Sequence, residues 1–409
     1  MTTTATPETS PSPSAPRRER LVLLSLWLMV FASSSQVMIV VPIMPRIGEA
    51  LEIPEALYGS LISGFAAALA LFALIIGPVS DRIGRRRVLL LGTGALTVIL
   101  ALHVFAVSYP ALLALRILAG AGAGVLSGAA VSYVGDYFPY SRRGWANGVV
   151  MTGFAFGQIL AIPLGTLLAD ARGFQAPFVA FAAPMVVAFA LILLAVPQPD
   201  VRLETAPLRA AEALRGYLEL LRDRVIAGAA VTYFLMFGAT STLFVYYPTW
   251  LETQLHARPR DIAAMFAIGG VIGVLSGPIA GRVSDRVGRK PVLISACVGF
   301  FALSLALPYT VREVFSAHVA FCVAMVLYAA RLSPLQALLT ALAPEQKRGR
   351  LLSLTVAVGQ LGSAAGAAAV GPLYAWSGYA TNTALTAAAM ALAGLVVWRV
   401  LPEPARDVA

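Results

Sequence analysis

The sequence predicts an all-α polytopic membrane protein, with twelve transmembrane helices arranged as two pseudo-symmetric halves of six. Three observations support this fold class: an apolar composition, twelve long apolar runs, and a polar loop that occurs twice. Of the 409 residues, 59% are hydrophobic and only 12% are charged. Soluble globular domains contain about 25% charged residues, so half that fraction indicates a membrane protein.

Twelve apolar runs are each long enough to cross about 30 Å of hydrocarbon as a helix. The predicted spans are 21–45, 56–79, 88–107, 110–138, 145–168, 177–196, 225–251, 261–280, 292–308, 314–342, 351–373 and 381–401. The longest polar break, 197–224, leaves six spans on each side.

A polar loop between the second and third spans recurs between the eighth and ninth. Gly-Pro-Val-Ser-Asp-Arg-Ile-Gly-Arg-Arg begins at Gly77, and Gly-Arg-Val-Ser-Asp-Arg-Val-Gly-Arg-Lys begins at Gly281. The two copies are 204 positions apart, half the length of the chain. This spacing indicates that the two six-span halves arose by duplication.

Basic residues predict how the chain is oriented. If the N-terminus is cytoplasmic, 23 of the 30 Lys and Arg residues fall in cytoplasmic tails, loops or span ends. Cytoplasmic loops are enriched in Lys and Arg, so we expect both termini to be inside a cytoplasmic (inner or plasma) membrane.

The chain divides into five segments by composition. We expect a disordered cytoplasmic tail at 1–20, six-helix bundles at 21–196 and 225–401, and a short cytoplasmic tail at 402–409. Apolar residues at helical spacing within the linker 197–224 predict an amphipathic helix on the membrane surface, in contact with lipid.

Several functional classes are excluded. The formal charge of +10 comes from short loops between apolar runs, so we expect no nucleic-acid partner. The chain has no phosphate-binding loop, no metal-ligand spacing and no nucleophile with a base, so we expect neither an enzyme nor a cofactor.

The repeated loop and the six-plus-six arrangement resemble the major facilitator superfamily, particularly its twelve-helix drug:proton antiporters and sugar-efflux permeases. Three further stretches resemble that group: the segment from Arg116 to Gly124, rich in small residues; the loop 139–144 with its echo at 344–349; and a helix-five pattern of Gly153, Gly157, Pro163 and Gly165. Gln158 stands where that pattern commonly has proline. The resemblance implies a secondary transporter that exports small organic molecules, with coupling to a proton gradient.

The repeated loop is also a candidate cytoplasmic gate. Glycines permit a tight turn and close helix approach, while Asp81 near a helix start can reach an arginine across the loop or be simply solvated. Asp136 ends the fourth span on the same side and can accept Arg82 or Arg85. The predicted gate residues are Gly77, Asp81, Arg82, Gly84, Arg85, Asp136, Asp285, Arg286, Gly288 and Arg289.

Polar residues within the spans are the candidate substrate contacts, because burying them is costly. In the fold that the resemblance implies, spans one, four, seven and ten line a central cavity. Gln36, Thr240 and Thr242 lie in two of these spans, although hydroxyls commonly bond back to their own helix. Arg116 and Arg331 lie within the other two; Arg116 is near enough to the external edge to snorkel. The predicted cavity residues are Gln36, Arg116, Gln158, Thr240, Thr242, Tyr328, Arg331 and Gln336.

Acidic residues are missing from the middle of every predicted span. Two buried arginines without a buried carboxylate make the cavity electropositive, which favours an anionic or neutral substrate over a lipophilic cation. A coupling proton would then use Asp136, Glu55 or Asp261, or one of the three histidines, His103, His256 and His318. We expect these histidines at the external interface.

The sequence thus predicts a monomeric transporter of small-molecule solutes, with export as the first interpretation. Import or facilitated movement of organic anions through Arg116 and Arg331 is a second interpretation, and a membrane sensor that has lost transport is a third.

Overall fold

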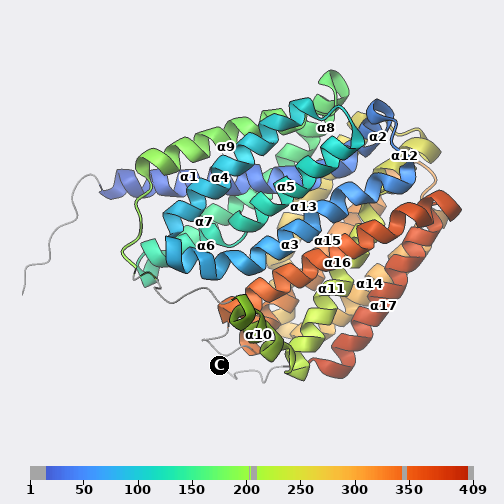
Figure 1. The fold of residues 1–409 in the computed structure, drawn as a ribbon. Coiled ribbons are helices and arrows are strands. Elements are labelled where there is room, and N and C mark those ends of the chain that lie inside the picture. The colour runs from blue at the N-terminus through green and yellow to red at the C-terminus, as the bar shows by residue number, and fades with distance from the viewer. Residues whose placement is uncertain (1–14, 202, 204–209, 343–347, 404–409) are drawn as a thin grey trace, which may run out of the picture.

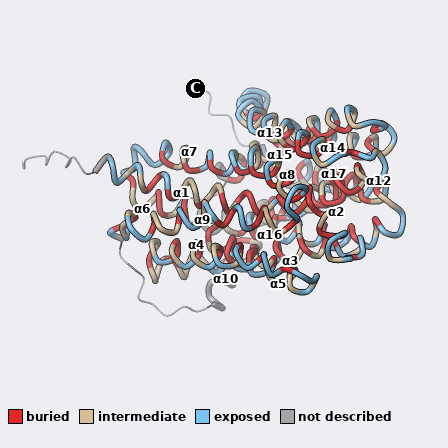
Figure 2. The backbone as a smooth tube through the Cα atoms, turned by 90° about the horizontal axis from the view of Figure 1, so that it is seen from above, coloured by how far each residue is buried: buried red, intermediate tan, exposed pale blue. Residues whose placement is uncertain are grey.

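The computed structural model describes residues 15–201, 203, 210–342 and 348–403. Twelve helical segments in this part of the chain are long and apolar enough to cross a membrane, which confirms the predicted fold class. They form one elongated bundle (Figure 1). Figure 2 shows buried and exposed positions alternating along each helix, as expected where one face packs and the other meets lipid.

The first half contains α1 (Ala15–Met38), α2 (Val40–Leu51), α3 (Tyr58–Ile83), α4 (Arg85–Leu102), α5 (Tyr109–Leu126), α6 (Ala129–Tyr137), α7 (Tyr140–Phe156), α8 (Ile162–Arg172) and α9 (Ala176–Ala195). The second contains α11 (Arg224–Phe244), α12 (Tyr247–Leu255), α13 (Pro259–Val287), α14 (Arg289–Thr310), α15 (Val314–Leu342), α16 (Arg348–Ser377) and α17 (Tyr379–Val400). Helix α10 (Ala210–Leu221) lies in the linker, and η1 (Glu55–Leu57), η2 (His103–Phe105) and η3 (Gly157–Ala161) are short turns.

Four spans are broken rather than continuous: α1–α2, α5–α6, α7–η3–α8 and α11–α12. Three breaks have the same cause. Pro42, Pro163 and Pro248 lack the N–H that would bond four residues back. Helix α1 accordingly ends at Met38 and α11 at Phe244, while Ile159 falls within the π-turn η3. The fourth break falls at the Ser127–Gly128 pair, between α5 and α6.

Two names are useful for the ends of the bundle. Helix α1 begins and α17 ends at what we call the terminal end, and α2 and α12 lie at the opposite, distal end. Helices α3 and α16, one from each half, run side by side (Figure 1). Helix α13 packs across the halves against η3 and α8.

One predicted boundary and one predicted helix face differ from the structure. The predicted tail 1–20 overlaps α1, which begins at Ala15 because a helix outside the hydrocarbon needs no apolar residues; residues 1–14 lie outside the described part. The predicted linker helix is present as α10. Among its leucines whose exposure is described, Leu220 is buried, whereas Leu218 is 53% exposed. Tyr217 Oη of α10 donates a hydrogen bond to the Leu74 carbonyl, which ties the linker to α3.

Candidate functional site

Arg331 lies at the centre of a polar cluster in the second half. Its side chain is 2% exposed, although it sits in the middle of α15. One guanidinium nitrogen donates to the Met236 carbonyl at 2.9 Å, and the other donates to the Thr240 hydroxyl. The guanidinium carbon lies 4.8 Å from the ring centre of Phe300 and 5.0 Å from that of Tyr328. Three of the predicted cavity residues, Thr240, Tyr328 and Arg331, therefore lie together in the structure.

A small cavity adjoins this cluster. Tyr233, Met236, Phe237, Tyr328, Arg331, Leu332 and Leu335 line it, and its volume is about 10 Å³. A cavity of that size holds one water molecule, so the site is closed to any larger solute in this conformation.

Arg116 forms the matching cluster in the first half. It is 1% exposed. Its side chain therefore does not extend to the membrane interface, although its position in the span would permit this. Its Nη1 donates to both the backbone carbonyl and the side-chain oxygen of Gln36, at 3.2 and 3.1 Å. Its guanidinium carbon lies 4.3 Å from the ring centre of Phe65. Gln36 stands two residues before the end of α1, so Arg116 holds the chain next to the break between α1 and α2.

The two arginines lie at different depths. Arg116 is seven residues from the distal start of α5, about 10 Å along the helix axis at 1.5 Å per residue. Arg331 is seventeen residues from the distal start of α15, about 25 Å by the same rise. Within the described residues neither forms an ion pair, so carbonyls, polar side chains and aromatic rings solvate both charges.

Two predicted cavity residues lie apart from these clusters, and a third, Gln336, bonds a residue that lines the Arg331 cavity. The hydroxyl of Thr242 is buried and shares a hydrogen bond of 2.7 Å with Thr386 of α17, so it contributes to helix packing. Gln158 lies in η3, whose backbone contacts α13 of the other half at Gly270. Gln336 forms a hydrogen bond with Tyr233, one turn beyond Arg331.

We expected His103 at the external interface, and it lies in η2, the turn that follows α4 at the distal end. It is completely buried there, so it is not an exposed interfacial side chain. Its ring stacks on Phe178 at a centroid distance of 4.2 Å. Its position at the end of an apolar run concealed this burial, because the run does not show that α9 covers it.

The predicted gate cluster is assembled at the terminal end of the first half. Arg85 Nη2 lies 2.6 Å from Asp81 Oδ1, and its Nε donates to Asp136 Oδ2 at 2.7 Å. Of the two arginines proposed for Asp136, the structure therefore pairs Arg85. Arg82 leaves its buried Nε and Nη1 unpartnered. Gly84 takes the turn with φ +93°, a conformation that favours glycine.

The second copy of the loop forms different side-chain contacts. Gly288 repeats the turn with φ +118°. Arg289 Nη2 lies 4.0 Å from Asp285 Oδ1, and Nη1 donates to the Ala337 carbonyl. Pro139 and Pro344 occupy equivalent positions of the two halves, 205 residues apart. By the same offset the position equivalent to Asp136 is an alanine, so the third member of the cluster has no counterpart at that position. Arg286 is exposed.

At the distal end the two halves are held together by contacts that the sequence did not predict. Arg46 of α2 forms an ion pair with Glu252 of α12, and its Nη2 lies 3.5 Å from Asp170 of α8. Tyr246 donates to the Glu55 carbonyl and accepts from the Gly59 N–H. The hydrogen bonds and ion pairs that join the two bundles in the described chain cluster here, so the distal end is closed.

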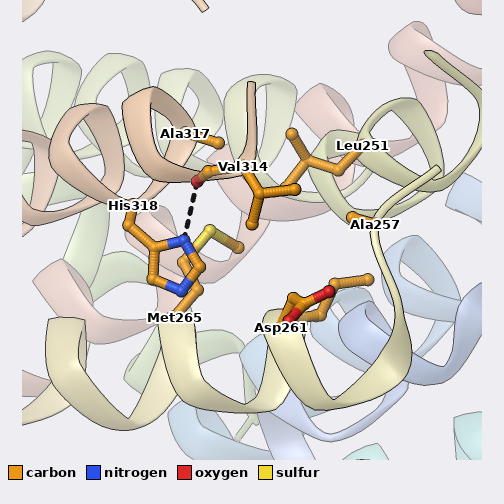
Figure 3. A pocket seen from close by; sticks show the side chains of 8 residues that line it. Leu251, Ala257, Asp261, Met265, Val314, Ala317 and His318 are labelled. Carbon is orange, nitrogen blue, oxygen red and sulfur yellow. Dashed lines mark hydrogen bonds between the residues drawn. The ribbon is translucent and has the colours of Figure 1, made fainter. Parts of the chain in front are cut away.

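Two of the three remaining proton candidates in the second half face one pocket. His318 and Asp261 both line a pocket between α13 and α15 (Figure 3). The ring Nδ1 of His318 is 2.8 Å from the Val314 carbonyl, and Asp261 accepts from the Arg258 N–H. Side chains fill this pocket almost completely. His256 is exposed at the end of α12.

Comparisons with known proteins agree with this architecture. The family model described as Major Facilitator Superfamily matches residues 26–330 and 229–409. The chain is 27% identical over 352 residues to the "Uncharacterized MFS-type transporter YceJ" of Bacillus subtilis (strain 168), covering 85% of this chain and 89% of that protein. It is 25% identical to the "Multidrug resistance protein MdtG" of Serratia proteamaculans (strain 568), over 66% of this chain and 67% of that one.

A solved structure of similar fold is the Escherichia coli xylose transporter XylE in a "partially occluded inward open conformation". Its TM-score is 0.76 at 17% identity, with 95% of this chain and 98% of that chain covered.

Proposed function

Because the chain belongs to the Major Facilitator Superfamily, and is therefore a membrane transporter of small solutes, we propose that it exports small organic molecules from the cytoplasm by alternating access. The closure of the distal end by the Arg46 and Tyr246 contacts is the observation on which this proposal rests. Closure of the distal end supports access to the site from the terminal end, where an exporter takes up its cargo.

The distribution of basic residues supports the orientation. In the predicted topology, 23 of the 30 Lys and Arg residues belong to the tails, loops and span ends on the side of the N-terminus, which supports a cytoplasmic terminal end by the positive-inside rule. The membrane is then the cytoplasmic membrane, and the chain works as a monomer with both termini inside. The similarity to the multidrug resistance protein MdtG supports export as the direction.

The buried arginines support an anionic or neutral substrate. Arg331 adjoins the cavity and carries a positive charge that no described carboxylate neutralises. A lipophilic cation entering here would meet a like charge in a medium of low dielectric constant, whereas a carboxylate or sugar hydroxyl could replace the contacts of Arg331 with Met236 and Thr240.

The cluster of Asp81, Arg85 and Asp136 supports a gating role at the cytoplasmic end. Arg85 joins three helices of one half, because Asp81 belongs to α3 and Asp136 to α6. These contacts support movement of the first half as a unit at this end, whereas the described part of the second half has no acid at the position equivalent to Asp136.

The test is solute transport in proteoliposomes with and without an imposed pH gradient. Ethidium, carboxyfluorescein and a radiolabelled neutral sugar represent cationic, anionic and neutral solutes. Arg331→Ala should reduce transport at least tenfold if Arg331 binds the solute, because a lost charged hydrogen bond is worth about 1.5–3 kcal/mol. Arg312→Ala is the matched control, because Arg312 is an exposed arginine two residues before α15.

Each outcome bears on the proposal. Outward movement of the anion or sugar, accelerated by the proton gradient and lost in Arg331→Ala, supports it. Uptake of the anion without an effect of the gradient would instead favour an importer or uniporter. Rapid ethidium efflux that survives Arg331→Ala would contradict the substrate class.

A further inference from the structure

The site around Arg116 contains buried polar atoms whose hydrogen bonds are missing. Arg116 Nε and Nη2 and the amide nitrogen of Gln36 are buried donors without a partner. Nε2 of His103 is also buried and unpartnered. Leaving buried donors and acceptors unpaired is costly, so a cluster of them needs a reason.

The tautomer of His103 is set by its own helix. Nδ1 lies 2.8 Å from the Ile99 carbonyl, which can only accept, so Nδ1 carries the hydrogen. In the neutral ring Nε2 is then a free acceptor. It is the complement of the free donors on Arg116 and Gln36, and it is the atom at which the ring binds a proton.

Phe178 places the imidazole and the guanidinium in one site. The His103 ring lies 4.2 Å from the Phe178 ring centre, and the Arg116 guanidinium carbon lies 5.9 Å from the same centre. The two groups are therefore at most about 10 Å apart, a separation over which charges interact appreciably in a buried site.

The surroundings contain no other charge that would control this proton. Helix α9, packed against η2, has no titratable side chain. Helix α5 contributes Arg116 and Tyr109, whose hydroxyl is paired with Ser60. In α4 itself the charged residues, 85–87, are at the other end of the helix.

We propose that His103 is the proton-binding residue of the Arg116 site, and that its protonation state governs the contacts of Arg116. With Nε2 neutral, His103 offers Arg116 a second acceptor. With Nε2 protonated, that acceptor is lost and two positive charges repel, so Arg116 keeps only its two Gln36 acceptors beside the α1–α2 break. His103 is thus a positioning residue: its proton acts on the helix break through Arg116. This inference rests on the proposed export and adds to it that a proton gradient drives the transport.

The test is nuclear magnetic resonance of histidine and glutamine side chains in the intact protein in lipid bilayers. The chain has three histidines, so single His256→Gln and His318→Gln variants assign the imidazole nitrogens. As pH falls from about 8 to about 4, the His103 Nε2 signal should change to that of a protonated nitrogen. The Gln36 side-chain signal should move with the same midpoint.

Two variants separate a coupling role from a packing role. His103→Gln and His103→Phe should both abolish the pH response of Gln36, and Phe retains the aromatic stack on Phe178. His256→Gln should leave the response unchanged. A His103 ring that stays neutral throughout, or one that titrates without any movement of Gln36, overturns the proposal. No solute is needed, so failure of proton-coupled transport in proteoliposomes would refute the proposed function and leave this measurement intact.

Discussion

Replacing Gly59 by alanine should prevent the distal end from closing. Gly59 lies in α3 of the first half, and a Cβ built there would lie 1.9 Å from the backbone oxygen of Ala367 in α16 of the second half. Four residues away, a Cβ at Gly371 would lie 2.1 Å from the Ala56 oxygen. Both clashes are with backbone atoms, which cannot rotate away as a side chain can.

The size of the effect follows from the geometry. Ordinary contacts of a Cβ begin near 3.4 Å, so α3 and α16 must separate by about 1.5 Å. Overpacking of this kind costs about 1–3 kcal/mol, which lowers the distal-closed population relative to other conformations by about 5-fold to 150-fold. The gain in helix propensity from glycine to alanine applies to every conformation and cancels.

Distances between spin labels across the distal end report this population. Ser108 of the first half and Thr310 of the second are exposed at that end, and each can be replaced by a labelled cysteine once Cys297 and Cys322 are changed to alanine. The unaltered chain should give a short distance, and Gly59→Ala should give a longer one.

Two alanine variants control for general damage to packing. Gly122→Ala places its Cβ 3.5 Å from Leu96 within one half and should change nothing. Gly366→Ala meets the Gly238 oxygen at 2.5 Å, also within one half, so it should lower the melting temperature without opening the distal end. If Gly59→Ala folds normally and keeps the short distance, the assignment of this contact to conformational closure is refuted.

Three further changes test other parts of the gate. Arg46→Ala removes the partly exposed ion pair with Glu252, which is worth about 1 kcal/mol. In the spin-label assay it should therefore lower the distal-closed population about fivefold. High salt screens the same ion pair and should reproduce part of the effect. Asp81→Asn should leave membrane insertion intact but reduce transport in proteoliposomes, because Arg85 loses one of its two carboxylates. Gly77→Val should act oppositely to Gly59→Ala and raise the distal-closed population; a longer label distance would contradict this.

The fold was predictable because hydrophobic length and loop charge are local properties of the sequence. The breaks within the spans were harder to predict from the sequence. Pro42, Pro163 and Pro248 coincide with breaks, but Pro78 and Pro278 lie inside the uninterrupted helices α3 and α13. A proline deletes one hydrogen bond in each case, and whether the helix then breaks depends on what the neighbouring helices supply.

The candidate site was predictable to the level of residue type. A buried arginine stands out in an apolar run, so Arg116 and Arg331 could be identified from the sequence. Their hydrogen-bond partners could not be identified from the sequence, because Gln36 lies 80 residues from Arg116 and Thr240 lies 91 residues from Arg331. The burial of His103 and the pairing of Arg46 with Glu252 likewise depend on how helices pack against one another, which no local pattern records.

The repeated loop and the distal contact are related through one face of α3. Gly59 and Gly77 are eighteen residues apart, which is five turns at 3.6 residues per turn, so both lie on the same face about 27 Å apart. Gly59 contacts α16 of the other half, whereas a Cβ at Gly77 would meet no described atom within 4 Å. The turn itself is made by Gly84, so it does not explain why Gly77 lacks a side chain. If the halves rock about the middle of the bundle, opening at Gly59 brings the other end of the same face toward the second half. We infer that Gly77 serves the closed contact of the opposite conformation, as Gly59 serves the one seen here.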